Sequence, residues 1–289
     1  RKGKRVVKTG RTHLMDAMPV TVEQEWLAWS AQLSSAISRF NDTAKRLQWL
    51  PLGGTAVGTG VNADPKAAML ACKALSKETG VRCVPAGNAF ESMAGQDHLV
   101  ELSGQCNGLA VTLMKIANDL RWMNSGPLTG LAELQLPELQ PGSSIMPGKV
   151  NPTQSEAITM VAAQVMGNDV AVTIGGTQGH YELNVFKPMM AANVLQSAQL
   201  LGDACQSFNV NCASGIEPNH DVIEKLLNNS LMLITALNTK IGYYKAAEIA
   251  NTAHKNGTTL KEEAINLGYV TAEDYDAWVK PENMIGNSK

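Results

Sequence analysis

Apolar residues recur at helical spacing along three long segments of the chain. From Leu102 to Met123 the gaps between apolar positions alternate between four and three residues. Val194 to Cys212 repeats this alternation, and Trp26 to Leu47 follows it after a first gap of seven. A repeat of about 3.5 residues favours near-parallel packing of helices. The positions are Leu33, Ile37, Phe40, Ala44 and Leu47; Leu102, Cys106, Leu109, Leu113, Ile116, Leu120 and Met123; Val194, Ala198, Leu201, Cys205, Phe208 and Cys212.

The same pattern predicts a mainly α fold with two domains. Thr21 to Gln24 and Thr153 to Glu156 have capping-box spacing, and the second box opens a helix through about Val170. Alternation with period two is scarce, so strands should be few and short. Beyond Gly215 to Asn219 come short helical stretches. They are Val222 to Ala236, Tyr243 to Lys255, Thr259 to Leu267 and Thr271 to Val279. We expect a long-helix bundle over residues 1–220 and a small helical C-terminal domain over 221–289.

Helical seams of this kind also suit bundles formed between subunits. We therefore predict a homo-oligomer, with a monomeric bundle as the alternative that sedimentation would decide.

Charge and composition narrow the classes of function. The 289 residues are 44% apolar and 17% charged, which is enough for a buried core. With 24 basic and 26 acidic residues the net charge is −2, so bulk charge does not favour nucleic acid. The longest apolar run, Val161 to Ile174, is interrupted by Gln164, Asn168 and Asp169, and we predict no membrane span. Five cysteines without a C-x-x-C pair predict buried free thiols.

The segment Gly142 to Pro152 carries the most informative chemistry. Ser143 and Ser144 offer hydroxyl groups on a glycine loop, and Lys149 and Asn151 stand just before a helix N-terminus. Such a terminus attracts anions, so the segment can hold a carboxylate. A glycine-serine turn with a capping Asn is the plainer alternative.

Neither glycine-bearing loop of the chain predicts a phosphate site. The loop at 142–149 is not a P-loop, because Val150 follows Lys149 where serine or threonine is required. Gly53 to Gly60 lacks a strand-turn-helix context, and positive φ angles are the expected role of its glycines.

One histidine stands out by its neighbours. In Gly10 to Ala17, His13 follows Thr12 ahead of a capped helix. A structural or solvent-exposed histidine is the usual alternative, and Glu156 has the equally ordinary role of third residue in a capping box. The remaining histidines form no metal-ligand spacing; they are His98, His180, His220 and His254.

These segments resemble the fumarase/aspartase superfamily, and specifically class II fumarate hydratase. Gly142 to Pro152 resembles the superfamily signature loop, and Gly148 is similar to the fumarase version, where aspartases commonly carry alanine. Further similar segments follow in the same order over the whole chain. They are Gly10 to Ala17, Leu52 to Asn62, Lys115 to Trp122, Gly167 to Gly176, Glu182 to Met189 and Ala213 to Asn219.

The resemblance implies reversible hydration of fumarate to (S)-malate, in the tricarboxylic acid cycle, without metal or organic cofactor. Ser143 is similar to the base that removes the C3 proton of malate. His13 resembles the second acid/base residue, with Glu156 as its carboxylate partner. Substrate-binding positions are matched by Thr12, Ser144, Lys149, Val150 and Asn151. The implied assembly is a homotetramer with sites built from more than one chain, in the cytoplasm or, in a eukaryote, the mitochondrial matrix.

Physical chemistry makes these roles intelligible. Loss of the C3 proton leaves an aci-carboxylate dianion, which placed donors such as Lys149 and Asn151 would stabilise. A base at Ser143 would need its alkoxide held by backbone N–H groups.

One departure from the family is large. Members carry an N-terminal portion ahead of the segment like Gly10 to Ala17, including a substrate loop, and this sequence lacks it. We expect a fragment with weak or no activity by itself. An aspartate ammonia-lyase and a non-catalytic helical assembly are the competing functions.

Overall fold

The computed structural model describes residues 5–286, which are mainly helical and form two compact units. The first unit contains residues 5–29, 122–137 and 215–286, and the second contains residues 30–121 and 138–214. The domain boundary expected at residue 220 stays a prediction.

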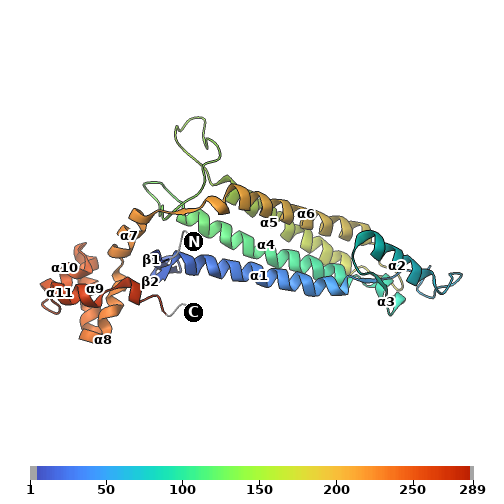
Figure 1. Ribbon diagram of the computed structural model, residues 1–289, viewed down its shortest axis with the longest axis horizontal. Coiled ribbons are helices and arrows are strands. Elements are labelled where there is room, and N and C mark those ends of the chain that lie inside the picture. The colour runs from blue at the N-terminus through green and yellow to red at the C-terminus, as the bar shows by residue number, and fades with distance from the viewer. Residues whose placement is uncertain (1–4, 287–289) are drawn as a thin grey trace. The chain divides into compact units, whose positions relative to one another are not determined.

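Four long helices form the bundle of the second unit. They are α1 (Val22–Arg46), whose first turns belong to the first unit, α4 (Asp97–Met123), α5 (Thr153–Gly176) and α6 (Lys187–Asn211). Figure 1 shows these helices running side by side. Their shared core comprises Cys106, Ala110, Leu113, Ala117, Ile158, Ala162, Val165 and Leu201, with Leu33 and Phe40 packed against it. The predicted long-helix bundle is confirmed.

The predicted seams are largely, but not wholly, correct. On α4 the buried seam residues are Cys106, Leu113, Ile116, Leu120 and Met123. On α1 the prediction is wrong at two positions. Ile37 is 63% exposed and Ala44 is also exposed, whereas Ala36 and Thr43 are buried. With 3.6 residues per turn, a step of three or of four residues can continue the same helix face. Periodicity alone therefore does not distinguish the buried position from the exposed one next to it. On α6, Ala198 is exposed and Ser197 is buried for the same reason.

Helix α5 is long and apolar enough to cross a membrane by length and composition alone. The contacts of its polar residues therefore decide whether α5 is a membrane span or a core helix. Asp169 accepts hydrogen bonds from Ser103 Oγ at 2.6 Å and Asn107 Nδ2 at 2.9 Å on α4. Asn168 Nδ2 donates to Ser197 Oγ on α6 at 3.1 Å. Buried polar groups need partners, and these contacts are those of a core helix in a bundle.

Short elements complete the second unit. The two-residue strands β3 (Trp49–Leu50) and β4 (Val84–Pro85) pair in parallel, with α2 (Ala67–Thr79) between them and α3 (Ala89–Ala94) after them. The loop after β3 has positive φ angles at Gly53, Gly58 and Gly60, as predicted.

A β-hairpin opens the first unit. Strand β1 (Val7–Thr12) pairs antiparallel with β2 (Met15–Thr21), and β5 (Leu134–Gln135) pairs antiparallel with β6 (Glu217–Pro218). Among residues 5–286 the strands are therefore few and short, as predicted. The capping box at Thr21 is also confirmed: Gln24 N donates to Thr21 Oγ1 at 3.0 Å, and Thr21 N donates to Gln24 Oε1 at 2.8 Å.

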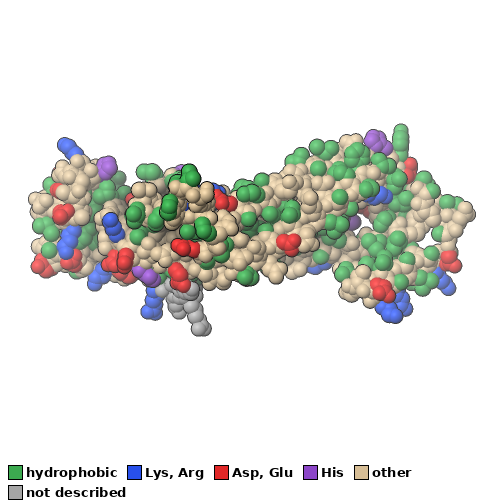
Figure 2. Space-filling view, turned by 90° about the horizontal axis from the view of Figure 1, so that it is seen from above, with side chains coloured by type: hydrophobic (Ala, Val, Ile, Leu, Met, Phe, Trp, Pro, Cys, Tyr) green, Lys and Arg blue, Asp and Glu red, His purple; other side chains and the backbone are tan. Residues whose placement is uncertain are grey.

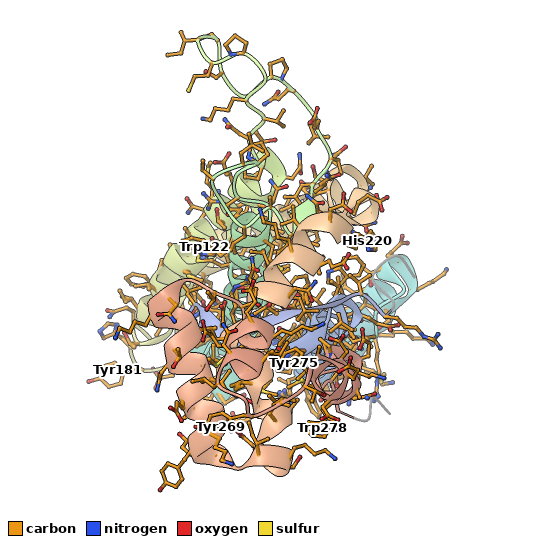
Figure 3. The ribbon with its side chains drawn as sticks, turned by 90° about the vertical axis from the view of Figure 1, so that its left-hand side faces the viewer. Trp122, Tyr181, His220, Tyr269, Tyr275 and Trp278 are labelled. Carbon is orange, nitrogen blue, oxygen red and sulfur yellow. The ribbon has the colours of Figure 1, made fainter. Side chains whose placement is uncertain are left out.

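Short helices form the rest of the first unit. They are α7 (His220–Asn229), α8 (Asn238–Ile241), α9 (Tyr243–Asn256), α10 (Leu260–Asn266) and α11 (Ala272–Trp278), with 3₁₀ turns at Ala213–Gly215, Leu231–Leu237 and Pro281–Asn283. Their core includes Leu237, Ile249, Ala264 and Tyr275, and Figure 3 shows Tyr275 among these helices.

The helix predicted from Val222 to Ala236 is wrong as one element. It breaks at Ser230, which is extended (φ −70°, ψ 121°) and whose Oγ accepts from Met232 N at 3.3 Å. Serine competes for backbone hydrogen bonds and therefore favours a cap over a helix interior.

Candidate functional site

The loop Gly142 to Asn151 is closed on itself by two hydrogen bonds. Gly142 N donates to Lys149 O at 2.7 Å, and Asn151 Nδ2 donates to Gly142 O at 2.9 Å. A side chain at position 142 would not fit, because its Cβ would lie 2.8 Å from Asn151 N. In Figure 1 the segment that leads into α5 projects away from the long helices. The closing bonds give this exposed segment a defined conformation.

Inside the loop, the hydroxyl of Ser143 is aimed at backbone donors. Its Oγ accepts from Met146 N at 3.0 Å and from Ile145 N at 3.3 Å. Ser143 is half-buried, whereas Ser144 beside it is exposed. Two N–H groups aimed at one oxygen favour negative charge on that oxygen. This is the environment that a serine base requires.

The positive charge of the loop is unneutralised within the described part of the chain. Lys149 is exposed, and among residues 5–286 no carboxylate oxygen lies within ion-pair distance of its Nζ. Val150 is exposed and Asn151 half-buried. One N–H of the Asn151 amide is bonded to Gly142, which leaves the second available to a ligand. The loop thus presents a cation and an amide donor where the chain enters α5.

The predicted capping box at the start of α5 is wrong. The N-cap position is Pro152, Thr153 is the first helical residue, and no side chain caps the helix. Thr153 N instead donates to Asn151 O, two residues earlier, at 2.8 Å. Glu156 therefore does not cap the helix, which was the ordinary alternative role for this residue.

Glu156 pairs with a residue that the sequence did not single out. Its Oε1 lies 3.9 Å from Nη2 of Arg121, near the end of α4, and both side chains are about two-fifths exposed. Nη1 of Arg121 is also 3.5 Å from Asn118 Oδ1. No sequence pattern marks a contact between residues this far apart in the chain. The ion pair holds the Glu156 carboxylate beside a positive charge.

His13 lies at the tip of the β1–β2 hairpin in the first unit. Thr12 pairs with Met15, so His13 and Leu14 form a two-residue turn, with φ angles of 56° and 62°. Positive φ at both central residues defines a type I′ turn, which normally uses Asn or Gly. Each side chain here costs about 1–3 kcal/mol of strain. Thr12 and His13 are both exposed. The hairpin thus presents its histidine to solvent at a strained turn.

A bulge shapes this hairpin. The register shifts between Thr9 and Arg11, and a Cβ at Gly10 would lie 2.4 Å from Met18 O. Only glycine permits this close approach of the two strands.

Comparison with known proteins places the chain in a family. The family model described as "Lyase" matches residues 1–167, which is more than half of the chain. The chain belongs to this lyase family. A second family model, described as "Fumarase C C-terminus", matches residues 233–286 of this chain.

This chain has relatives that confirm its predicted resemblance to class II fumarate hydratase. It is 59% identical to "Fumarate hydratase class II" of Pasteurella multocida over 286 residues, which is 99% of this chain and 62% of that protein. It is also 59% identical to "Fumarate hydratase, mitochondrial" of Homo sapiens, over 97% of this chain and 55% of that protein. The chain therefore spans less than two thirds of the length of these relatives.

A solved structure supports the same conclusion about the fold. The crystal structure of recombinant class II fumarase from Schistosoma mansoni aligns with a TM-score of 0.93 at 39% identity, over 97% of this chain and 62% of that one. The predicted family and the mainly helical fold class are confirmed.

The predicted site residues of the chain lie in two places. The loop and first turn of α5, in the second unit, carry Ser143, Ser144, Lys149, Val150, Asn151 and Glu156. The hairpin of the first unit carries Thr12 and His13. The roles of these residues, including the pairing of Glu156 with His13, stay predictions.

The five cysteines of this chain are free thiols. Cys72, Cys106 and Cys212 are buried, as predicted. Cys83 and Cys205 are half-buried instead. Burial raises the pKa of Cys106 and of Cys212 to about 11, so these two thiols stay protonated and are poor nucleophiles. Within residues 5–286, no group of three or more His, Cys, Asp or Glu residues is placed to hold a metal ion.

Proposed function

We propose that the full-length product of the gene encoding this lyase hydrates fumarate reversibly to (S)-malate. The observation that carries the proposal is the 59% identity to a class II fumarate hydratase over 99% of the chain. The loop at 142–151 supports it, because its groups suit a substrate that carries two carboxylates and gains negative charge during the reaction.

In the direction of dehydration, the Oγ of Ser143 takes the proton from C3 of malate. Serine is a weak base, and the two backbone N–H groups that donate to its oxygen support this role by favouring the alkoxide. The electron pair left on C3 delocalises into the adjacent carboxylate, which becomes an aci-carboxylate dianion.

Stabilisation of that dianion falls to the groups around the loop. Lys149 supplies a positive charge, Asn151 a free amide N–H, and the start of α5 its unpaired backbone N–H groups. Donors fixed where charge develops are worth about 3–4 kcal/mol each. Thr12, Ser144 and Val150 complete the binding of substrate in this proposal.

Loss of the C2 hydroxyl as water is assigned to His13, with Glu156 as its carboxylate partner. The Glu156 carboxylate does not cap α5, and its Oε1 lies 3.9 Å from Nη2 of Arg121, so it would act as a partner that itself stands beside a cation. No metal or organic cofactor enters the proposed reaction.

We also propose that the enzyme is a homotetramer. Large apolar side chains on the bundle helices are exposed in this single chain; they include Ile37, Val111, Met160, Val170, Leu195 and Val210. Figure 2 shows hydrophobic side chains gathered over the long helices with few charged ones among them. Many large apolar side chains exposed on one set of helices are typical of an interface. Sedimentation at the mass of a monomer would count against the tetramer.

Hydratase activity is tested by following the absorbance of fumarate with the full-length product. We expect the protein to interconvert fumarate and malate. We also propose that it is located in the cytoplasm or, in a eukaryote, in the mitochondrial matrix. The chain printed here, assayed in parallel, is expected to show weak or no turnover because its relatives are longer. Ammonia release from aspartate would favour the ammonia-lyase, and a folded protein inert toward every dicarboxylate would favour a non-catalytic assembly.

A further inference from the structure

A buried carboxylate in the first unit is shared by two cations from one strand. Glu133 is completely buried, and Nη1 of Arg11 donates to both of its carboxylate oxygens, at 2.9 and 3.0 Å. Nζ of Lys8, itself 2% exposed, lies 3.2 Å from Glu133 Oε2. Lys8 also donates to Glu25 Oε1 at 3.0 Å. Both cations belong to β1, so the cluster fixes this strand to the segment that carries Glu133.

The segment around Glu133 is itself held in place. The backbone carbonyl of Glu133 accepts from Asn219 N at 2.8 Å, and Ala132 N donates to Ser125 O at 2.8 Å. Leu136 N donates to Asn124 Oδ1 at 3.1 Å. Glu133 is thus a fixed point onto which β1 docks.

Stability alone does not account for this arrangement. Desolvation of buried charges offsets much of their attraction, so a buried ion pair is weak evidence for stabilisation. The placement of one guanidinium nitrogen, Nη1 of Arg11, against both oxygens of Glu133 does define position. Arg11 is two residues from His13, and its partner across the hairpin is Asp16, which makes this the second pair below the strained turn. Strained backbone persists only where its surroundings determine it.

We propose that the Arg11–Glu133 pair is a positioning device that holds His13 in its working orientation. This rests on the proposed function, in which His13 is the acid/base residue. Arg11 does not itself touch the reacting atoms in this proposal. It fixes the last strand residues before the turn, and an acid/base group must be held within about half an ångström of its productive place.

The test compares Arg11→Met with Arg11→Lys in the full-length protein. Arg11→Met removes the charge, whereas Arg11→Lys keeps a cation but loses the guanidinium, whose Nη1 donates to both oxygens of Glu133 while its Nε lies 3.9 Å from Asp16 Oδ1. We expect kcat to fall by about tenfold or more in Arg11→Met, since small misplacements of catalytic groups carry costs of that order. KM should change less, and the limb of the kcat pH profile that reports His13 should shift. Arg11→Lys should recover part of the rate.

A matched control removes an exposed ion pair of the same unit. Lys261 and Asp276 lie 2.7 Å apart at the surface, and Asp276→Asn is expected to leave kcat and the pH profile unchanged. If Arg11→Met does not fold, Arg11→Lys carries the same comparison.

Two outcomes would overturn the proposal. In the first, the Arg11 variants lose thermal stability but keep the wild-type kcat and pH profile per folded protein. In the second, Arg11→Lys is indistinguishable from wild type in both readouts. Failure of the wild-type protein to hydrate fumarate would instead refute the proposed function. Hydrogen exchange of residues 7–21 would then still test the pair, since unchanged protection in Arg11→Met would show that it does not order the hairpin.

Discussion

The Oγ atom of Ser143 lies 3.0 Å from the backbone nitrogen of Met146, which donates a hydrogen bond to it. With the N–H of Ile145 at 3.3 Å, two donors converge on one hydroxyl oxygen. A hydroxyl that accepts two hydrogen bonds can still donate its own proton elsewhere. Loss of that proton would leave an oxyanion already facing two donors.

Ser143→Ala is therefore expected to lower kcat in the full-length protein by about 10²–10⁴-fold, the usual contribution of a positioned proton acceptor. KM should change less, because Lys149 and Asn151 remain. Fumarate absorbance measures the rate, and gel filtration checks that the oligomer is retained. Ser92→Ala, at a serine on α3 that is half-buried like Ser143, is the matched control. A rate within a few-fold of wild type would remove Ser143 from the mechanism.

His13→Asn separates the chemistry of the histidine from the shape of its turn. Asparagine tolerates positive φ better than most residues, so the turn at φ 56° should keep its conformation. It cannot exchange a proton near neutral pH, and we expect kcat to fall by about 10²–10⁴-fold. Far-UV circular dichroism and the pH profile of kcat are the checks. His254→Asn, at an exposed position of α9, should behave as wild type; equal rates for both variants would exclude His13.

The bundle could be predicted from the sequence because its signal is periodic and local. On α4 nearly the whole seam from Cys106 to Met123 is buried as predicted. The errors on α1 concern Ile37 and Ala44, where a helix face can be continued by a step of three or four. At Ser230 a single side-chain hydrogen bond ends a helix that the apolar pattern would continue.

The site was predictable only in part. The loop around Ser143 could be recognised because all its chemistry lies within eleven consecutive residues. The partners of Glu156 and of Arg11 could not, since Arg121 and Glu133 meet them only after the chain has folded. Charge pairs that are distant in sequence leave no periodic trace. The wrong capping box has a local cause instead, because Pro152 takes the N-cap position and the amide of Thr153 donates to Asn151 O two residues earlier.

Gly142→Ala tests whether the closed loop matters. Its new Cβ would lie 2.8 Å from Asn151 N, so the loop could not keep its two closing hydrogen bonds. We expect KM for malate to rise and kcat to fall, each by about tenfold, because the loop donors lose their fixed geometry. Tm should move by only about 2 °C, since the loop is exposed. Gly87→Ala, whose Cβ meets only Trp49 at 3.8 Å, is the control. Unchanged kinetics in Gly142→Ala would show that loop closure is dispensable.

Because Tyr275 is buried, we expect the C-terminal helices to lose stability at alkaline pH. Burial raises the pKa of Tyr275 from 10.0 to about 12. Because the folded-state pKa is raised, its contribution is full below pH 10 and is lost as the pH rises toward 12. Between pH 9 and 11 the free energy of unfolding should fall by about 1.4 kcal/mol more in wild type than in Tyr275→Phe, which cannot ionise. Urea unfolding at the two pH values measures this difference. Tyr181→Phe, at a position 92% exposed, should follow wild type; an equal fall in Tyr275→Phe would assign the alkaline loss to other groups.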